Sequence, residues 1–331
     1  MIQLLADWLG QAQGWLFETV IQPFIYYAGI GDITEEAFEG TEWLLIGLCE
    51  LLLIFLVLRP LESMIPVHQF TDKRARWNDF VYTILQRIGV FPVLIFFTLD
   101  PLLDLVVAHL RMDGLRPFNL ENLVPDMNPL TSFVIYLVVI DFVDYWFHRA
   151  QHHFNWWWGL HSLHHSQENM NLWSDDRNHV LDDLLRDTVM GLVAIAIGVQ
   201  PAQYVLLVSL SRILQSLQHA NVRIHFGAIG ERLLVSPRFH RMHHAIGVGH
   251  ESQGQGTLGG CNFGVLLPVW DILFGTANFT PRFQRTGVRD QLPQTAPDGS
   301  TIPGRNYGRG FWAQQWLGLK RMVEFAGRKS V

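Results

Sequence analysis

Long apolar runs, separated by short polar breaks, are the main feature of the sequence. An α-helix needs about 20 mostly apolar residues to cross the hydrocarbon core of a bilayer. Five runs approach or reach this length, at residues 41–58, 88–110, 130–147, 184–199 and 201–217. Each run predicts a helix, and together they favour a membrane-embedded bundle over the single buried core of a soluble domain.

Some of these runs leave the number of crossings open. Asp100, Pro101 and Asp104 interrupt the second run, so its helix is expected to kink or to end early. The fourth and fifth runs are short and are separated at Gln200, with Pro201 suited to the first turn of the next helix. They fit either a tight transmembrane hairpin or a pair of helices that enters the bilayer and returns.

The two ends of the chain have a different pattern. Residues 1–40 carry acidic and amide side chains between their apolar and aromatic residues. They predict an amphipathic helix at the membrane interface, with a solvated or oligomer-contacting helix as the alternative. Residues 284–307 are rich in Pro, Gly and polar residues and predict a loop, whereas 310–325 predict a basic amphipathic helix suited to an anionic membrane surface.

Composition supports a membrane protein and excludes several other classes. Hydrophobic residues make up 49% of the 331 residues and charged residues only 16%, against about 25% charged residues in soluble domains. The apolar content excludes a disordered chain, and two cysteines are too few for a disulfide scaffold or an iron–sulfur cluster. The net charge of −6 argues against nucleic acid as a partner.

The placement of basic residues predicts the orientation in the membrane. The first 58 residues contain no Lys or Arg, whereas the connection 59–87 contains five. The positive-inside rule therefore puts the N-terminus outside and this connection in the cytoplasm. Five crossings would also put residues 148–183 and 218–331 on the cytoplasmic side, in a bacterial inner membrane or, in a eukaryote, the endoplasmic reticulum.

Histidines are concentrated in the second half of the chain. Thirteen of the fifteen follow residue 140, and eight of them form three clusters with helical spacing. The clusters are His148 and His152; His161, His164 and His165; and His240, His243 and His244. Residues three or four apart share one helix face, so each cluster presents its imidazoles together.

These clusters predict a site for two metal ions. Imidazole binds Fe, Zn, Cu and Ni, whereas the lack of nearby cysteine disfavours a structural zinc site and the scarcity of carboxylates disfavours Mg or Ca. Eight histidines exceed what one ion can use. The predicted fold is therefore an all-α integral membrane protein, a bundle of about four to five transmembrane helices with a cytoplasmic histidine-rich helical cap that holds a di-metal site.

The sequence around the histidines resembles the membrane fatty acid hydroxylase/sterol desaturase superfamily. The resemblance extends from about residue 141 to 276 and leaves 1–130 and 285–331 outside. The matching segments are DYWFHRAQH at 144–152, WGLHSLHHS at 158–166, QHAN at 218–221, PRFHRMHH at 237–244, NFG at 262–264 and WDILFGT at 270–276. We therefore divide the chain into an N-terminal interfacial segment, transmembrane helices and loops, a fatty acid hydroxylase-like catalytic domain and a C-terminal loop and helix, at 1–40, 41–129, 130–283 and 284–331.

The resemblance implies a non-haem di-iron oxygenase. Such enzymes use O₂ and two electrons to hydroxylate, desaturate or cleave lipids such as sterols, fatty acyl chains or alkylglycerols. The implied cofactors are two Fe ions, with zinc as a substitute in purified protein. His219, in the QHAN match, is the implied additional ligand. His179 is a further candidate, although a histidine that only hydrogen-bonds a ligand would fit its position equally well.

The chain departs from the superfamily after His244. Relatives usually have a short acidic link there, whereas residues 245–261 are longer, glycine-rich and contain His250. We expect this segment to be a flexible cover for the site, with His250 either an extra ligand or solvated.

A separate electron donor is also expected. The sequence shows no candidate haem-binding or flavin domain, so a ferredoxin, a cytochrome b5-like protein or a reductase would supply electrons. Arg223, Arg232, Arg238 and Arg241 would form a docking surface, or would simply follow the positive-inside bias.

Two other functions remain as alternatives. A zinc-dependent lipid hydrolase or isomerase on the same scaffold would need no O₂. A non-enzymatic metal carrier would be expected to place histidines or carboxylates along the membrane-spanning runs, whereas these clusters lie beyond them.

Several polar residues inside or beside the apolar runs also need partners. Asp141 and Asp144 are close enough to His148 to orient imidazoles, although a plain helix-end role is equally compatible. Glu50 and Arg212 are costly in an apolar run unless they are paired or face a cavity. Nearby aromatic residues fit an interfacial belt better than substrate contacts; they are Tyr145, Trp146, Trp156, Trp157 and Trp158.

Overall fold

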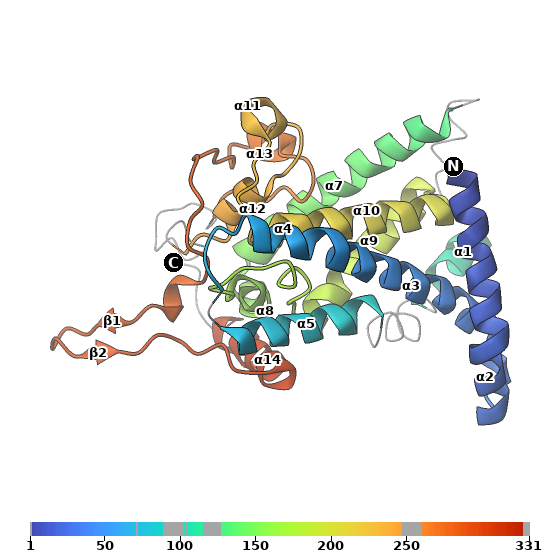
Figure 1. Ribbon diagram of the computed structural model, residues 1–331, viewed down its shortest axis with the longest axis horizontal. Helices are drawn as coiled ribbons and strands as arrows, with labels where there is room; N and C mark the ends of the chain where they lie inside the picture. The colour runs from blue at the N-terminus through green and yellow to red at the C-terminus, as the bar shows by residue number, and fades with distance from the viewer. Residues whose placement is uncertain are drawn as a thin grey trace. The chain divides into compact units, whose positions relative to one another are not determined.

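The computed structural model is mostly helical, with almost no β-sheet, in the part of the chain that it describes (Figure 1). The described residues are 2–70, 72–88, 102–103, 105–114, 127–246 and 260–326. The chain divides into two compact units, Met1–Leu56 with Ile84–Leu115 and Val57–Thr83 with Arg116–Val331. All nine histidines that come together in the site belong to the second unit.

The first unit is a set of N-terminal helices. Its elements are α1 (Ile2–Leu16), the π-helical turn η1 (Phe17–Ile21), α2 (Gln22–Ala28), the 3-10 turn η2 (Gly31–Ile33) and α3 (Thr34–Leu53). The chain reverses after α2, so that α1 packs on α3, where Gln13 Nε2 donates to the Phe38 carbonyl at 3.0 Å. Trp8 and Trp15 stay exposed, as the amphipathic pattern of this region predicts.

An ion pair inside the first unit explains the acidic residue in the first apolar run. Glu50 is buried and accepts from Nη1 of Arg87, the last residue of α5 (Lys73–Arg87), at 2.9 Å. Gly47 allows this approach, because a Cβ there would lie 2.0 Å from the Arg87 carbonyl oxygen. The cost of burying the carboxylate is thus offset by a directly hydrogen-bonded guanidinium.

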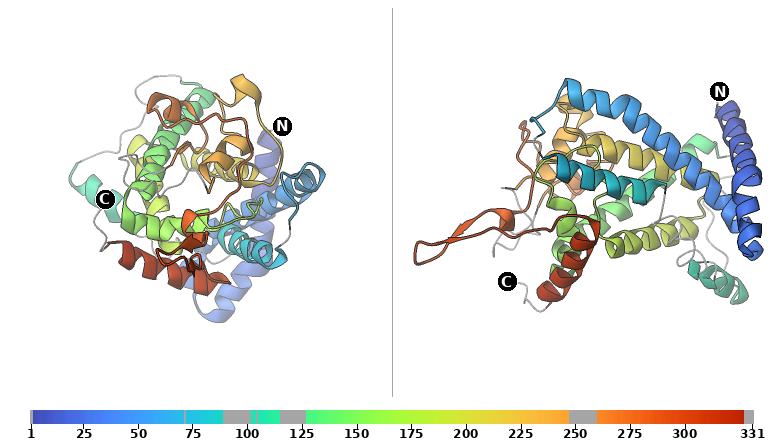
Figure 2. Two further views of the ribbon diagram at one scale, coloured as in Figure 1. Left: turned by 90° about the vertical axis from the view of Figure 1, so that its left-hand side faces the viewer. Right: turned by 60° about the horizontal axis from the view of Figure 1, so that its bottom comes forward.

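The second unit contains the remaining helices. They are α4 (Arg59–Met64), which follows the π-helical turn η3 (Ile54–Leu58), then α7 (Pro129–His153), α8 (Asn155–His165), α9 (Val180–Ile197), α10 (Pro201–His219), α11 (Gly227–Gly230), α12 (Pro237–His243), α13 (Val269–Leu273), the 3-10 turn η5 (Arg289–Gln291) and α14 (Phe311–Ala326). A hairpin of the strands β1 (Gln294–Thr295) and β2 (Thr301–Ile302) projects from this unit before α14 (Figure 2).

Local sequence determines where the site-bearing helices begin. Asn128 caps α7, since its side chain accepts from the Leu130 backbone N–H at 2.9 Å, and Pro129 occupies the first turn. Ser236 caps α12 in the same way, by accepting from the Phe239 N–H at 3.1 Å. α7 ends where Phe154 takes an extended conformation, and α8 starts at the next residue. This one-residue break turns the chain and brings the two helices together.

α8 also packs closely against the C-terminal helix α14 (Figures 1 and 2). Gly159 makes the contact possible, because a Cβ there would lie 2.5 Å from the Met322 backbone nitrogen. A small cluster of buried side chains, Trp158, Val288, Tyr307 and Phe325, lies at the same contact. The predicted helix at 310–325 is therefore confirmed as α14, and one of its faces is buried in the protein.

Two helical stretches are long and apolar enough to cross a membrane, Gly31–Met64 and Pro129–His153. They contain the predicted runs 41–58 and 130–147. The fourth and fifth runs are also helical, as α9 and α10, but they do not meet the same criteria of length and composition. Most of the second run lies outside the described residues. The number of crossings therefore stays a prediction.

Candidate metal centre

Nine buried histidines form two groups in the second unit. In each group the ring nitrogens that could bind a metal lie within 4.8 Å of one another. The first group contains five histidines, His148, His152, His161, His165 and His243, and the second contains four, His164, His219, His240 and His244. The three sequence clusters and His219 therefore meet in space, as the di-metal prediction requires.

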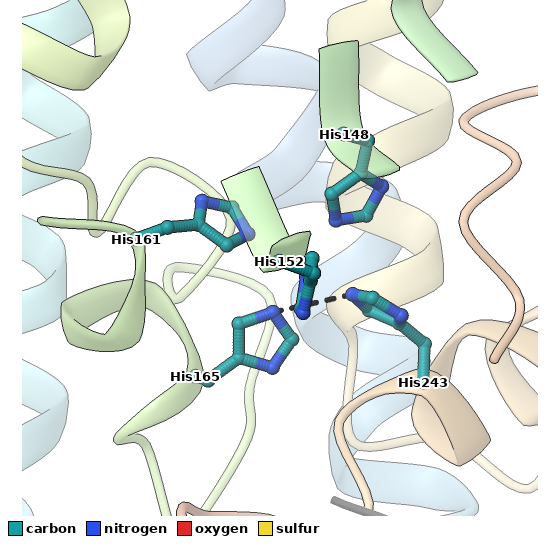
Figure 3. Close-up of side chains that lie close together, drawn as sticks. All are labelled: His148, His152, His161, His165 and His243. Atoms are coloured by element: carbon teal, nitrogen blue, oxygen red, sulfur yellow. Dashed lines mark hydrogen bonds between the residues drawn. The ribbon is translucent and has the colours of Figure 1, made fainter. Parts of the chain in front are cut away.

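Helices α7, α8 and α12 supply the five-histidine group, whose rings point toward a common centre (Figure 3). His148 and His152 lie one turn apart on α7, and α8 returns alongside to add two rings with the same spacing. His243 approaches from α12, and its Nε2 lies 3.2 Å from Nε2 of His165. Helical i, i+4 spacing therefore sets four of the five positions.

Helices α8, α10 and α12 supply the four-histidine group. His219 ends α10, and its Nε2 lies 3.1 Å from that of His164 and 3.0 Å from that of His240. His244, directly after α12, places its Nε2 3.1 Å from that of His240. These nitrogens are close enough together to serve as ligands of one metal ion.

The two groups adjoin. His165 of the first group and His244 of the second stack with ring centroids 4.2 Å apart. The HH pairs at the end of each motif explain this arrangement, because His164 and His165 send their rings to different groups, as do His243 and His244. Two neighbouring ions are therefore the arrangement that the donor set fits.

Hydrogen bonds at Nδ1 fix three rings of the five-histidine group. His148 Nδ1 lies 2.8 Å from the Phe263 carbonyl oxygen, and His243 Nδ1 lies 2.8 Å from that of Cys261. A carbonyl oxygen only accepts, so each Nδ1 carries the proton and each Nε2 keeps its lone pair. His161 Nδ1 lies 3.0 Å from Asp182 Oδ2, and its buried Nε2 has no hydrogen-bond partner among the described residues. Lone pairs left in this way are what a metal ion requires.

Asp182 is a residue of the site that the sequence analysis missed. This buried carboxylate, on the first turn of α9, also accepts from Gln151 Nε2 at 2.9 Å and from Trp157 Nε1 at 2.6 Å. It thus ties α7, α8 and α9 together behind the His161 ring. Nothing in the spacing distinguishes it, because the same helix also carries Asp183 and Asp187.

Fewer hydrogen bonds fix the four-histidine group. His219 Nδ1 lies 2.8 Å from the Gln215 carbonyl oxygen and 3.3 Å from Asp175 Oδ1. The Nδ1 atoms of His164 and His240 are buried and have no hydrogen-bond partner in the described part of the chain.

Burial, followed by repulsion from neighbouring imidazoles, determines the charge of this second group. These effects lower the pKa of His164, His240 and His244 well below the usual 6.5. All three rings are therefore neutral at neutral pH, which is the form that binds metal.

Two buried aspartates, Asp141 and Asp271, hold the segment 263–270 in place. Asp141 accepts from the Leu266 N–H at 2.8 Å and from Trp270 Nε1 at 2.9 Å. Asp271 accepts from the Phe263 N–H at 2.8 Å. The Phe263 carbonyl accepts from His148 Nδ1, and the Phe263 N–H donates to Asp271. The NFG and WDILFGT segments therefore orient the His148 ring through the backbone of Phe263.

Asp144 has a different partner from the imidazoles considered for it. It forms a two-point ion pair with Arg186 of α9, with Oδ1 2.9 Å from Nε. Together with the bonds of Asp141 to backbone and indole N–H groups, this pairing explains both acidic residues in the third apolar run. Each aspartate holds a neighbouring segment in place. The sequence alone does not distinguish this role from that of an acceptor for an imidazole.

His179 lies outside both histidine groups. Its Nε2 is 2.9 Å from the Gln315 carbonyl oxygen, and its Nδ1 accepts from the Leu181 N–H at 3.2 Å, which caps α9. His225 is exposed and accepts from the Gly227 N–H in a turn. His250 and residues 247–259 lie outside the described residues, so the expectation of a cover there stays untested.

The four arginines expected at a docking surface differ in their exposure. Arg241 is only 3% exposed and donates to the Gln284 carbonyl at 2.8 Å and to His68 Nδ1 at 3.1 Å. Arg238 pairs with Glu231 at 2.6 Å. The expectation is therefore wrong for Arg241, which is buried between the candidate ligands His240 and His243 of α12. Arg223 and Arg232 are exposed.

The aromatic residues near the site divide into two sets. Trp158 is 6% exposed, with its ring centroid 5.1 Å from that of His152, and Trp157 donates to Asp182. Trp146 and Trp156 are exposed, which fits the interfacial belt. The belt interpretation therefore does not extend to Trp157 and Trp158, whose contacts are with the site. It is also wrong for Tyr145, which is fully buried with its hydroxyl 2.9 Å from Thr276 Oγ1.

The donor set fits two iron ions or other metals that prefer nitrogen ligands. All nine candidate ligands are imidazoles, which bind metal in their neutral form. Cys261 takes part through its backbone carbonyl, which accepts from His243 Nδ1. Imidazole nitrogen suits Fe, Zn, Cu and Ni, and a site this rich in nitrogen is a poor one for Mg or Ca.

Comparison with known proteins agrees with this geometry. Residues 133–276 match the family model described as fatty acid hydroxylase. The chain is 26% identical over 230 residues to "Ornithine lipid hydroxylase OlsE" of Rhizobium tropici. This alignment covers 69% of this chain and 65% of the relative. It is 31% identical over 167 residues to "Alkylglycerol monooxygenase" of Homo sapiens, covering 50% of this chain and 33% of the relative.

A second alkylglycerol monooxygenase, from Xenopus tropicalis, is 28% identical over 165 residues, or 49% of this chain and 33% of the relative. The matches thus span less than two thirds of the length of each of these relatives. No solved structure matches the chain. The matched region contains every histidine of both groups, and the family model and these relatives support a fatty acid hydroxylase domain at residues 133–276.

Proposed function

We propose that this protein is a membrane-bound di-iron oxygenase that hydroxylates or desaturates a lipid. The observation that carries the proposal is the pair of adjoining histidine groups, nine buried imidazoles with convergent nitrogens. Unactivated C–H bonds have no acidic proton and no leaving group, so acid–base side chains alone cannot oxidise them. Two iron ions held by the two groups would supply the chemistry that activates O₂.

The overall hydroxylation balances as one C–H bond, one O₂, two electrons and two protons giving one C–OH and one water. One oxygen atom enters the lipid and the other leaves as water. The chain's own part is to hold the ligand rings and to keep bulk water away. The Phe263 and Cys261 carbonyls and Asp182 orient three imidazoles, and all nine rings are buried.

A lipid substrate is supported by the named relatives and by the position of the site on the helices. One relative is a hydroxylase of ornithine lipid and others are alkylglycerol monooxygenases by name. His148 and His152 lie at one end of α7, a candidate membrane span. A lipid in the bilayer would therefore reach the site along this helix, and the positive-inside rule puts that end in the cytoplasm.

The two electrons would come from a separate donor protein. Imidazoles and carboxylates do not change oxidation state under these conditions, so the reducing equivalents must arrive from outside the described site. A ferredoxin, a cytochrome b5-like protein or a reductase would meet this need. Exposed Arg223 and Arg232 offer positive charge for an acidic partner.

Lipid profiling under labelled oxygen tests this function. Cells that express the intact chain are compared with cells that express His164→Ala, each grown with ¹⁸O₂ or ¹⁶O₂, and iron is measured in the purified proteins. A labelled lipid that forms only with the intact chain supports an oxygenase. A lipid change that does not depend on O₂ would instead indicate a zinc hydrolase or isomerase, and no lipid change with verified iron would favour a metal carrier.

A further inference from the structure

A second cavity lies outside the histidine groups, where α7 meets the segment 274–280. Its volume is about 630 Å³, and none of the described residues that line it is a candidate metal ligand. Ligand pockets in proteins commonly measure about 300–1,000 Å³, so this cavity has room for the polar end of a lipid. Among the described residues of its wall, Arg149 is the only one that carries a charge.

Arg149 brings this charge to the cavity without an ion-pair partner among the described residues. Its Nη1 donates to the Tyr145 hydroxyl at 3.1 Å, and its Cζ lies 4.8 Å from the centroid of the Trp146 ring. Its Nε is buried and has no hydrogen-bond partner in the described part of the chain. The carboxylate of Asp271, which attracts this guanidinium, accepts instead from backbone N–H groups and a hydroxyl. An oxyanion in the cavity would therefore satisfy a buried donor and gain a charged hydrogen bond.

An exposed apolar surface adjoins the cavity through Phe274, which belongs to both. We call this surface the α7–α13 patch; it consists of Phe142, Trp146, Ile272, Leu273 and Phe274, each at least 36% exposed. The ring centroid of Phe274 lies 4.9 Å from that of Trp146 and 6.4 Å from that of Phe142, so the two helices form one surface. Exposed apolar patches mark binding surfaces. Because α7 is a candidate membrane span, we expect the patch to face lipid.

We propose that the cavity binds the oxyanion of an anionic membrane lipid, a phosphate or a carboxylate, at Arg149, and that an acyl chain of the same lipid lies on the α7–α13 patch. The cation and the apolar surface adjoin, as the two ends of such a lipid require. A soluble anion would use only the cation, and an uncharged lipid would use only the patch. No step of the proposed oxidation is assigned to the bound lipid, so the inference does not depend on the proposed function.

Lipid binding to the intact chain is the first test. The iron-loaded protein in detergent is titrated with phosphatidylglycerol and with diacylglycerol that has the same acyl chains, and native mass spectrometry counts the bound lipids. A charged hydrogen bond is worth about tenfold or more in affinity, so the tightest site is expected to prefer phosphatidylglycerol by at least about tenfold. Equal binding of the two lipids would overturn the inference.

Competition with the free headgroup separates a lipid site from a site for soluble anions. Glycerophosphoglycerol has the headgroup of phosphatidylglycerol without its acyl chains. Burial of an acyl chain adds affinity, so glycerophosphoglycerol is expected to bind at least about tenfold more weakly. If it displaces phosphatidylglycerol at equal concentration, the assignment to a lipid is wrong.

Two pairs of variants then assign the binding to this cavity. Arg149→Gln is expected to weaken phosphatidylglycerol binding at least about tenfold. Arg309→Gln, the same change at an exposed arginine outside the cavity wall, is expected to have no such effect. Because Arg149 follows the candidate ligand His148, Thr280→Asp gives a second test by adding a carboxylate at an exposed residue of the wall, and Thr280→Asn is its uncharged control.

The α7–α13 patch has its own variant. Leu273→Gln is expected to weaken phosphatidylglycerol binding and to leave glycerophosphoglycerol binding unchanged, and Leu292→Gln is the control at an exposed leucine outside the patch. Iron content and unfolding temperature are measured for every variant, and Thr280→Asp decides if Arg149→Gln loses iron. Unchanged lipid affinity in Thr280→Asp, or in an Arg149→Gln protein that keeps its iron and its unfolding temperature, would overturn the inference.

Discussion

The two histidine groups differ in how the protein holds their rings. In the five-histidine group, three Nδ1 atoms are fixed by Phe263, Cys261 and Asp182. In the four-histidine group, His219 Nδ1 lies near two acceptors, whereas the Nδ1 atoms of His164 and His240 have none among the described residues. The first group is therefore largely positioned before a metal binds, whereas the second depends more on the metal itself.

This difference predicts unequal metal affinities. Rings that are already oriented lose less freedom when they bind an ion, so the five-histidine group is expected to retain its ion longer during chelation. The four-histidine group, three of whose rings line a cavity of about 80 Å³, is expected to lose its ion first. The predictions below test this order and are arranged from the largest expected effect to the smallest.

Removal of one ligand from either group is expected to have the largest effect. His243→Ala and His240→Ala should each reduce turnover at least about a hundredfold, more than the loss of a residue that only hydrogen-bonds a ligand ring. Each should also lower iron content by up to one ion per chain. Iron analysis beside lipid turnover checks this, and full iron loading with full activity in either variant would refute the assignment of that group.

Loss of the carboxylate behind His161 is expected to weaken the five-histidine group selectively. Asp182→Asn removes the carboxylate that contacts His161 Nδ1, and the loss of such a hydrogen-bond partner of a ligand ring costs about 10–100-fold in metal affinity or activity. Asp175→Asn should cost less, because Gln215 still accepts from His219. Competition with a chelator measures both. Equal losses would show that the two groups do not differ in the way described above.

Packing of α8 affects both groups together, because this helix carries ligands of each. Gly159→Ala would drive a Cβ into the Met322 backbone of α14, and overpacking of this kind costs about 1–3 kcal/mol. We expect a lower unfolding temperature and a similar fractional loss of both ions. Gly14→Ala is the control, since a Cβ there meets nothing within 4 Å; it should be neutral or stabilising.

The pH dependence of the four-histidine group follows from its lowered pKa values. His164, His240 and His244 are neutral at pH 6 because burial lowers their pKa well below 6.5. Protons therefore compete with the metal only as the pH falls toward those lowered values. Metal occupancy should change little between pH 7.5 and 6, measured by equilibrium dialysis. A loss centred near pH 6.5 would contradict the burial effect.

Stability of the metal-free protein should fall on the acid side of the same range. Below pH 6.5 the unfolded chain binds protons at histidines that stay neutral in the folded state, so the free energy of unfolding decreases as the pH falls. His68 adds to this, because burial and then Arg241 lower its pKa to about 4. The contribution of neutral His68 to the free energy of unfolding is therefore lost as the pH falls from 6.5 to 4. The unfolding temperature of the metal-free protein, measured across this range, checks the prediction.

The smallest effect on metal content is expected at His179. Its ring nitrogens contact the Gln315 carbonyl and the Leu181 N–H. His179→Asn keeps a side chain that can cap α9 and should leave iron content unchanged. A loss of one ion in this variant would return His179 to the ligand set.

Much of the helical framework and most of the candidate ligands were predictable from local patterns. Runs of apolar residues predicted α7, α9 and α10, and spacings of three and four predicted which imidazoles share a helix face. Local patterns did not predict the pairing of Glu50 with Arg87, because the two residues are 37 positions apart and nothing in either segment refers to the other.

By itself the sequence determined the type of donor and its number, since helical periodicity and residue identity are local properties. Only the tertiary structure decided which group each ring joins, with adjacent histidines such as His164 and His165 sent to different groups. It also decided that Asp182 serves His161 while Asp144 pairs with Arg186. These choices depend on distances between helices, which are set by packing at residues such as Gly159 and Phe154 and are not encoded in any one segment.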